Sequence, residues 1–389
     1  MTRRPQVLFY ALHLLGVGHV HRAAQLCSAL TRLGLDVDLV LGGPPLEEMT
    51  IDCRSLTQLP PIAVTDASYS TYVDGEGQPL GAAWMANRQA QLLAQFETAQ
   101  PDAILIEAFP FGRRVVRHEL RALLDAAEQR RPKPLIVSSV RDVLHENRKP
   151  GRAEETVATV KRFFDHVLVH ADPALVTLAD SFSLAQDISD RIAYSGFVTK
   201  HAKPSRVTPL ETDIVVSAGG GAFGEGLLRA ALDAAKADPN RRWLLITGRN
   251  APADVHRHLS DAVPAHVRVE RYVPDLPGQM RTAKITVSQC GYNTAMDALG
   301  ARDGAGTAIV FVPHDGGNQT EQLKRSRLLE QNGFCVCLPE TELSTPRLLA
   351  AMNQAVGLPS PTKRILFDGA RRSADMILDW IGAHRHAAR

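Results

Sequence analysis

Long apolar runs, charge of one sign and paired cysteines are all scarce in this sequence. No apolar run approaches the roughly 20 residues that span a bilayer, so the sequence predicts a soluble protein. The 44 lysines and arginines nearly balance the 42 aspartates and glutamates. This balance disfavours nucleic acid as a partner, because that interaction usually needs a basic excess. The five cysteines have neither zinc-site nor Cys-x-x-Cys spacing, which favours reduced, buried thiols in a cytoplasmic protein.

The sequence also lacks internal repeats, low-complexity tracts and a secretory cleavage site. The apolar residues 7–12 are interrupted at His13, and no small-residue cleavage motif follows them. We therefore expect a first β-strand there and no signal peptide.

Short apolar runs alternate with amphipathic segments, a pattern typical of parallel sheets with crossover helices. The alternation starts twice, with expected strands at residues 6–12, 37–41, 103–107, 135–140, 166–169 and 191–194, and again at 213–217, 243–247, 267–270, 285–288, 308–312 and 334–337. Between the two series, residues 195–204 have few apolar anchors and predict a linker. The sequence thus predicts an α/β protein with two doubly wound, Rossmann-like domains, residues 1–199 and 200–362. A helical tail, residues 363–389, is expected to pack back toward the first domain.

The turn after the first expected strand combines glycines with a histidine, Gly16-Val17-Gly18-His19. It is not a dinucleotide fingerprint, because His21 stands where the third glycine would be. A neutral imidazole at such a strand end can take a proton from a hydroxyl group at physiological pH. The alternative is that His19 is an ordinary residue of a helix start.

Two turns in the second half have the composition of phosphate sites. Consecutive glycines at Gly219-Gly220-Gly221 indicate close approach of the backbone to a phosphate or to a neighbouring domain. Residues 288–297 place Asn293 and Thr294 in the first turn of a helix, where their side chains join backbone N–H groups that favour a diphosphate.

A further polar cluster, residues 315–322, follows the next expected strand. Its carboxylate and amide side chains can grip the hydroxyls of a sugar, although a capped and solvated helix start explains the same composition.

Together these motifs resemble the nucleotide-sugar glycosyltransferases of the GT-B fold over essentially the whole chain. Residues 289–297 look like the donor box His-Cys-Gly-Trp-Asn-Ser-x-x-Glu of small-molecule UDP-glycosyltransferases, with departures at Gln289, Tyr292, Thr294 and Asp297. The segment 16–19 is similar to the Gly-x-Gly-His start of the bacterial N-acetylglucosaminyltransferase that completes lipid II. Residues 107–113, 139–142 and 289–294 resemble uncharacterised bacterial proteins described as predicted glycosyltransferases, a family name that carries no acceptor.

The resemblance implies two domains that face each other across a cleft, with His19 as the general base. In many relatives an acidic residue on a later strand end orients this histidine. Glu107 and Asp142 both fit that description, and the sequence does not choose between them.

The resemblance also implies a donor site, mainly in the second domain. Asn293, Thr294, Gln289 and the backbone at Gly291 would hold the diphosphate, and Asp297 would bind the ribose. Glu321 and Gln322 would bind sugar hydroxyls, and the backbone near Val273 would recognise the base. The full expected set is Gly18, Gly219, Gly220, Gly221, Val273, Ser288, Gln289, Gly291, Asn293, Thr294, Asp297, Glu321 and Gln322.

These expectations describe an inverting glycosyltransferase that moves a hexose or N-acetylhexosamine from a nucleoside-diphosphate sugar, with UDP favoured, to a hydroxyl acceptor. No Asp-x-Asp motif stands at an expected strand end, so we expect neither a metal nor a cofactor. One alternative is a GT-B epimerase or hydrolase, which needs further carboxylates and no acceptor. Another is a non-catalytic nucleotide-sugar-binding protein, which predicts a lost base at position 19.

Loops 65–81 and 109–114 are expected to form the acceptor pocket. The sequence leaves open the identity of the acceptor, the sugar and the base. It also leaves open the oligomeric state and any peripheral contact with a membrane.

Overall fold

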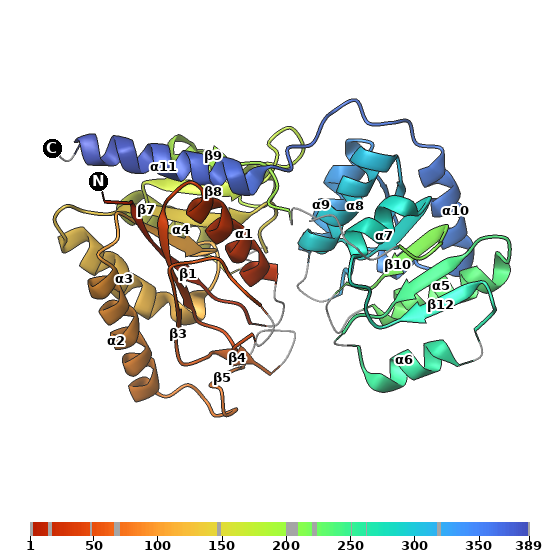
Figure 1. Cartoon of the computed structure of the whole chain (residues 1–389), viewed down its shortest axis with the longest axis horizontal. Helices are drawn as coiled ribbons and strands as arrows, with labels where there is room; N and C mark the ends of the chain where they lie inside the picture. Colours follow the sequence, from red (N-terminus) through yellow and green to blue (C-terminus); the bar gives the residue numbers. More distant parts are fainter. Residues whose placement is uncertain are drawn as a thin grey trace. The chain divides into compact units, whose positions relative to one another are not determined.

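In a computed structural model the chain folds into two compact units (Figure 1). Unit 1 contains the chain up to Val198 and again from Leu366 onward, and unit 2 runs from Thr199 to Ile365. The division between Val198 and Thr199 lies next to the boundary expected after residue 199. The residues that the structure describes are 3–14, 18–46, 49–65, 71–145, 149–199, 209–219, 224–249, 251–261, 263–316 and 320–387.

The described part of unit 1 contains a seven-stranded parallel sheet in the order β3-β2-β1-β6-β7-β8-β9. Its strands are β1 (Gln6–Ala11), β2 (Asp36–Leu41), β3 (Ser55–Gln58), β6 (Ala103–Glu107), β7 (Leu135–Arg141), β8 (His166–His170) and β9 (Ile192–Tyr194). A separate antiparallel pair joins β4 (Ala63–Val64) to β5 (Tyr72–Val73). The helices are α1 (Gly18–Arg32), α2 (Ala82–Ala99), η1 (Arg114–Val116), α3 (Arg117–Gln129), α4 (Arg152–Phe163), η2 (Leu178–Asp180), η3 (Ala185–Arg191) and α11 (Gly369–Ala387).

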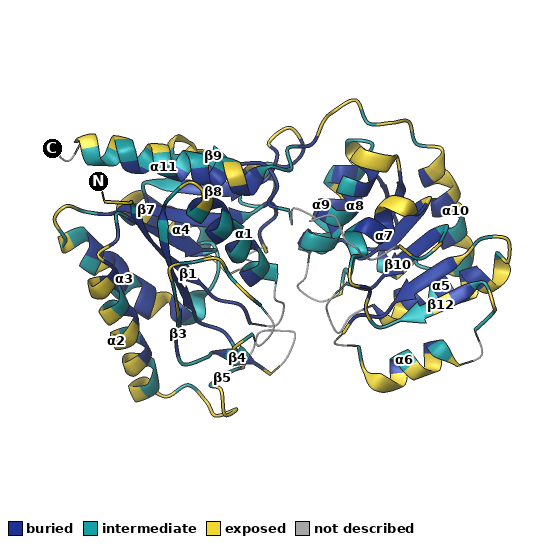
Figure 2. Ribbon diagram, viewed as in Figure 1, coloured by how far each residue is buried: buried dark blue, intermediate teal, exposed yellow. Residues whose placement is uncertain are grey.

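Alternate residues of β1 show how the sheet of unit 1 is covered on both faces. Phe9 packs in an apolar cluster with residues of α1 and α11. Tyr10 points to the opposite face, where its hydroxyl donates to Glu119 of α3 (2.6 Å) and accepts from Arg88 of α2 (2.9 Å). Side chains two residues apart along a strand share a face, so one strand serves two layers of helix. Figure 2 shows these strands in dark blue between helices that are exposed on their outer sides.

The C-terminal helix α11 belongs to unit 1 although it is the last element in the sequence (Figure 1). Ile377 and Ile381 of α11 are buried in an apolar cluster that also contains residues of α1 and β1. Phe197 N donates to Leu366 O (2.7 Å), and Gly369 N donates to Phe197 O (3.1 Å). The expected linker over 195–204 is therefore wrong for residues 195–198. Its buried Phe197 and Val198 anchor it to the returning chain, and residues 200–204 lie outside the described residues.

The described part of unit 2 contains a six-stranded parallel sheet in the order β12-β11-β10-β13-β14-β15. Its strands are β10 (Ile214–Ser217), β11 (Trp243–Ile246), β12 (Val267–Glu270), β13 (Ile285–Ser288), β14 (Ala308–Phe311) and β15 (Val336–Cys337). Its helices are α5 (Glu225–Ala237), α6 (Ala253–Ser260), α7 (Leu276–Thr282), α8 (Tyr292–Ala305), α9 (Glu321–Gln331), η4 (Glu340–Glu342) and α10 (Thr345–Val356). The fully buried Trp243 lies in the apolar cluster that α5 and α10 form with the sheet.

The two sheets have the same doubly wound topology, in which the chain proceeds outward from β1 or β10 and then resumes on the other side of it. The point of reversal lies between β1 and β6 in unit 1 and between β10 and β13 in unit 2. Ligands of open α/β sheets bind outside the carboxyl ends of the strands at this switch point.

Two further expectations concern membrane-spanning segments and the state of the cysteines. No helix in the described ranges is both long and apolar enough to cross a membrane. The five cysteines are free thiols. Four are buried as expected, whereas Cys53 is only half-buried.

Candidate functional site

The switch point of unit 1 brings a histidine and a carboxylate together. His19 lies in the first turn of α1, the helix that follows β1, and Glu107 is the last residue of the neighbouring strand β6. Nδ1 of His19 lies 2.8 Å from both carboxylate oxygens of Glu107. An ionised carboxylate only accepts hydrogen bonds, so the neutral ring donates through Nδ1 and keeps Nε2 as its basic nitrogen.

Arg22 completes this group from the next turn of α1. Its Nη2 donates to Oε1 of Glu107 and lies 3.3 Å from Nδ1 of His19. Arg22 and Glu107 are both buried. Three residues separate His19 from Arg22, a spacing that puts both on one helix face and could have identified Arg22 from the sequence.

Burial and charge set the protonation of this site. Burial lowers the pKa of His19 to about 3, and the charge of Arg113 acts in the same direction, whereas Glu107 acts against them. Burial opposes ionisation of Glu107, yet His19 and Arg22 hold the pKa of Glu107 well below its usual range. At neutral pH the site therefore holds a neutral imidazole beside a carboxylate.

Glu107 and Asp142 were equal candidates in the sequence, and the structure joins Glu107 to His19. Asp142 is also buried and follows β7, one strand further along the sheet. Behind Glu107, Ser139 of β7 contacts Nε2 of the buried His170 (2.7 Å), whose Nδ1 contacts Ser195 (3.0 Å). The sequence interpretation missed His170, because nothing in its local motif marks the network.

The switch point of unit 2 is built from glycines and a helix start. Gly219 follows β10 with φ +73°, and a side chain there would lie 3.6 Å from Oγ1 of Thr294 in α8. Gly248, after β11, has φ +94°, and a Cβ atom there would lie 2.6 Å from the carbonyl oxygen of Gly219. Close backbone approach at this edge thus requires glycine at position 248. Gly220 and Gly221, like Gly16 and Val17, lie outside the described residues.

The donor-box residues lie at the end of β13 and the start of α8. Gly291 is the N-cap of α8, and Asn293 and Thr294 are half-buried in its first turn. Ser288 and Gln289 are buried, and Oγ of Ser288 has no hydrogen-bond partner within the described ranges. This arrangement presents N–H groups of a helix start, the geometry that favours an anion.

Gln322 ties this turn to the next strand end. Its Oε1 accepts from the backbone N–H groups of Cys290 (3.0 Å) and His314 (3.3 Å). The buried Arg325, one turn along α9, donates to the carbonyl oxygen of Cys290 (2.7 Å). The side-chain oxygen of Gln322 therefore holds two turns in place. The amide N–H groups of the same side chain are then the atoms that could donate to a ligand.

Other expected positions lie nearby in unit 2. Asp297 is half-buried one turn further along α8, and Glu321 is half-buried at the start of α9. Val273 is buried next to Tyr272, whose exposed ring is covered by the guanidinium group of Arg249 at 3.9 Å. Tyr272 and Val273 line a cavity together with Arg268 and Gln279.

His314 and Glu340 form a pair that the sequence interpretation missed. His314 Nδ1 lies 2.6 Å from a carboxylate oxygen of Glu340. The other oxygen of Glu340 faces Gly226 in the first turn of α5, where a Cβ atom would lie 3.3 Å from it.

The described residues contain no group of three or more histidine, cysteine, aspartate or glutamate side chains that could hold a metal ion.

Comparisons with known proteins agree with this architecture. Residues 214–361, within unit 2, match the glycosyltransferase family 28 C-terminal domain. An uncharacterised glycosyltransferase of Methanosarcina acetivorans is 25% identical over 185 residues, which is 45% of this chain and 46% of that protein. The match thus spans less than half the length of that relative.

Solved structures extend the similarity to both units. The glycotransferase of kitacinnamycin is 15% identical with a TM-score of 0.60, and the alignment covers 99% of this chain and 98% of that one. MurG of Acinetobacter baumannii is 16% identical with a TM-score of 0.57, over 97% of this chain and 100% of that one. The chain has the GT-B fold, and residues 214–361 of its second unit match the family 28 C-terminal domain.

Proposed function

We propose that this protein is an inverting, metal-independent glycosyltransferase. It transfers a hexose or N-acetylhexosamine from a nucleoside-diphosphate sugar, with UDP as the favoured nucleotide, to a hydroxyl group of an acceptor. The family 28 match and the GT-B fold support the reaction class. The geometry at His19 supports the mechanism.

The observation that carries the proposal is the hydrogen bond between His19 and Glu107 at the switch point of unit 1. Glu107 fixes the ring with Nδ1 protonated, as the third member of a catalytic triad does for its histidine. Nε2 of His19 then takes the proton of the acceptor hydroxyl. The ionised Glu107 stabilises the imidazolium ion that forms and takes no proton itself.

The acceptor oxygen forms a bond to the anomeric carbon, and the bond from that carbon to the diphosphate oxygen breaks. Attack from the face opposite the leaving group inverts the anomeric configuration. The nucleoside diphosphate departs with the electron pair of the broken bond, and the proton stays on His19 until solvent removes it.

In this proposal unit 2 holds the leaving group without a cation. The start of α8, with Asn293, Thr294 and the backbone at Gly291, faces the diphosphate. Asp297 binds the ribose, and backbone near Val273 binds the base. Glu321 and the amide N–H groups of Gln322 bind sugar hydroxyls.

A two-stage experiment tests the proposal. Thermal shift against UDP, GDP, ADP and dTDP sugars first identifies the nucleotide, because a ligand that binds only the folded state raises the melting temperature. The stabilising donor is then incubated with pools of hydroxyl acceptors, and NMR of the product reports its anomeric configuration. His258→Ala, an exposed histidine of unit 2, is the matched control for His19→Ala. A product of retained configuration, or donor consumption that needs no acceptor, would refute an inverting transferase.

A further inference from the structure

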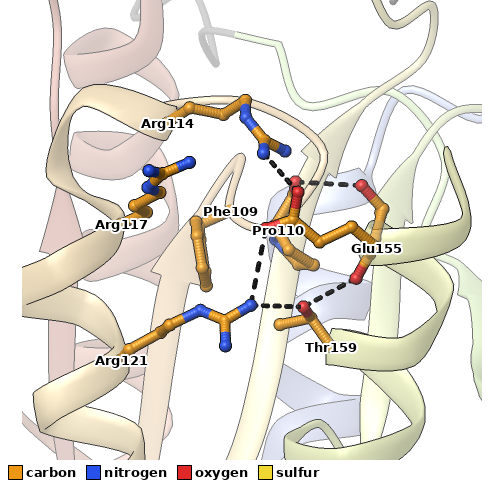
Figure 3. Close-up of a pocket in the computed structure, with 8 residues that line it drawn as sticks. Phe109, Pro110, Arg114, Arg117, Arg121, Glu155 and Thr159 are labelled. Atoms are coloured by element: carbon orange, nitrogen blue, oxygen red, sulfur yellow. Dashed lines mark hydrogen bonds and ion pairs between the residues drawn. The ribbon is translucent and has the colours of Figure 1, made fainter. Parts of the chain in front are cut away.

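Three arginines of the η1–α3 segment converge on one carboxylate of α4 (Figure 3). Arg114 donates through Nη2 to Oε2 of Glu155. Nη2 of Arg121 lies 3.5 Å from Oε1 of Glu155 and 3.4 Å from Oγ1 of Thr159. Arg117 lies between them in Figure 3. Two guanidinium groups thus contact a single carboxylate, and the charge of a third, that of Arg117, acts on the same carboxylate.

The fold alone does not favour this concentration of positive charge. The backbone N–H of Arg117 donates to Arg114 O, but its side chain makes no hydrogen bond or ion pair within the described part of the chain. Like charges three and four residues apart on a helix repel each other. Arg114 and Arg117 also lie at the N-terminal end of α3, where the helix dipole is itself positive. A bound anion would relieve each of these unfavourable terms.

The cluster lies at the functional edge of the unit 1 sheet. Arg114 follows the loop that leaves β6 after Glu107, and Glu155 lies in the first turn of α4, the helix after β7. Two residues of this loop, Ala108 and Arg113, have left-handed backbones with φ of +64° and +57°. Such conformations are costly for residues other than glycine and cluster at ligand sites.

We propose that Arg114, Arg117 and Arg121 bind a phosphate group, and that the Glu155 carboxylate occupies this place when the phosphate is absent. Planar guanidinium groups match phosphate oxygens with paired hydrogen bonds. The space left among the side chains is about 10 Å³, room for about one water molecule, so a phosphate has to displace Glu155. The Glu155 side chain is 38% exposed and can turn toward solvent.

The state of Glu155 agrees with its role as a displaceable anion. The hydrogen bond from Arg114 lowers the pKa of Glu155, and the charges of Arg121 and Arg117 act in the same direction. The carboxylate is therefore ionised at neutral pH and competes with an incoming phosphate. The proposal goes beyond the glycosyltransferase function and uses no step at His19, so the two stand or fall separately.

Calorimetric titration of the full chain with inorganic phosphate, against sodium chloride at equal ionic strength, tests the site. We expect Glu155→Gln to bind phosphate about tenfold more tightly than wild type, because the competing charge is gone while a hydrogen-bonding oxygen remains. Arg117→Gln is expected to bind about tenfold more weakly. Arg131→Gln removes the same charge beyond the opposite end of α3, from an exposed side chain that donates to the backbone carbonyls of Glu128 and Arg130, and should bind as wild type does.

Melting curves show whether each variant is folded. If Glu155→Gln fails to fold, Arg117→Gln still tests the proposal. The same titration with methyl phosphate distinguishes a site for phosphate esters, which binds both ligands, from one for the free ion, which prefers inorganic phosphate. The proposal is overturned if neither wild type nor Glu155→Gln binds phosphate beyond the chloride control. Equal weakening in Arg117→Gln and Arg131→Gln would also overturn it, since net charge would then explain the binding.

Discussion

The two switch points of this molecule share a topology and differ in the chemistry that occupies them. In unit 1 the edge between β1 and β6 holds a buried carboxylate, an arginine and a histidine in mutual contact. In unit 2 the edge between β10 and β13 holds close-packed backbone at Gly219 and Gly248 and the start of α8. The doubly wound fold provides a place where strand ends converge, and the residues at that place decide whether it can move a proton or hold an anion.

The largest expected difference between the two units is in their stability at low pH. Burial lowers the pKa of His13 to about 4, and burial lowers the pKa values of His19 and His170 to about 3. These side chains stay neutral in the folded state, while the unfolded chain takes up protons below its ordinary histidine pKa of about 6.5. Stability is therefore lost as the pH falls from about 6.5 toward 4, by about 2 kcal/mol per histidine at pH 5.

Differential scanning calorimetry at pH 7.5 and pH 5 measures this difference. The described histidines of unit 2 are half-buried or exposed, so its transition should move less than that of unit 1. Equal shifts of both transitions would contradict the expectation.

His19→Ala should remove the proton acceptor of unit 1 and leave unit 2 intact. We expect turnover to fall by about 10² to 10⁴, the range for loss of a general base. Donor affinity measured by calorimetry should change little. Near-normal turnover in this variant would exclude His19 from the mechanism, with His258→Ala as the control for a neutral substitution.

Asn293→Ala and Thr294→Ala, unlike His19→Ala, should lower the affinity for the donor. Each removes a donor from the start of α8, which we expect to cost about 1 to 3 kcal/mol of affinity for both the nucleoside diphosphate and the intact nucleotide sugar. Calorimetric titration of the two ligands measures both losses. If either variant lowered turnover while both affinities stayed at the wild-type value, these side chains would have no part in holding the diphosphate.

Gln322→Ala should weaken the intact donor more than the free diphosphate. Loss of the side-chain contacts is expected to cost about 0.5 to 1.5 kcal/mol. Part of this loss reaches the diphosphate, because Gln322 also holds the backbone at Cys290. Equal losses for the two ligands would mean that Gln322 only shapes the turn and does not touch the sugar.

A chelator should have the smallest effect of all. If the start of α8 and its neutral donors meet the charge of the leaving group, turnover in excess EDTA should equal that of the untreated enzyme within about twofold. Loss of turnover that magnesium or manganese restores would show that unit 2 needs a cation.

The sequence predicted the buried framework of this fold well and its edges less well. Strands such as β6 and β13 match their expected ranges, because short runs of apolar or β-branched residues define them. The strand β3 (Ser55–Gln58) was missed, since it lies at the sheet edge, three of its four residues are polar and none is buried. The first part of the expected linker was wrong, because its anchors lie far along the chain at Leu366 and Gly369.

Side-chain partnerships in the candidate site were the least predictable part. The choice between Glu107 and Asp142 depends on which strand lies next to β1, and that order cannot be read from either motif. The contact of Gln322 with the backbone at Cys290 likewise depends on how two helix starts meet. The sequence identified residue types suited to the chemistry, and only the packed chain shows which of them touch.

The position of α11 has a consequence for how the protein is made. Synthesis proceeds from the N-terminus, so all of unit 2 has left the ribosome before Ala370, Ile377 and Ile381 can complete the apolar cluster of unit 1. Unit 2 is a continuous piece of chain that can fold during translation, whereas unit 1 closes only after the last helix emerges. A premature stop shortly after residue 365 would therefore damage the unit that was synthesised first.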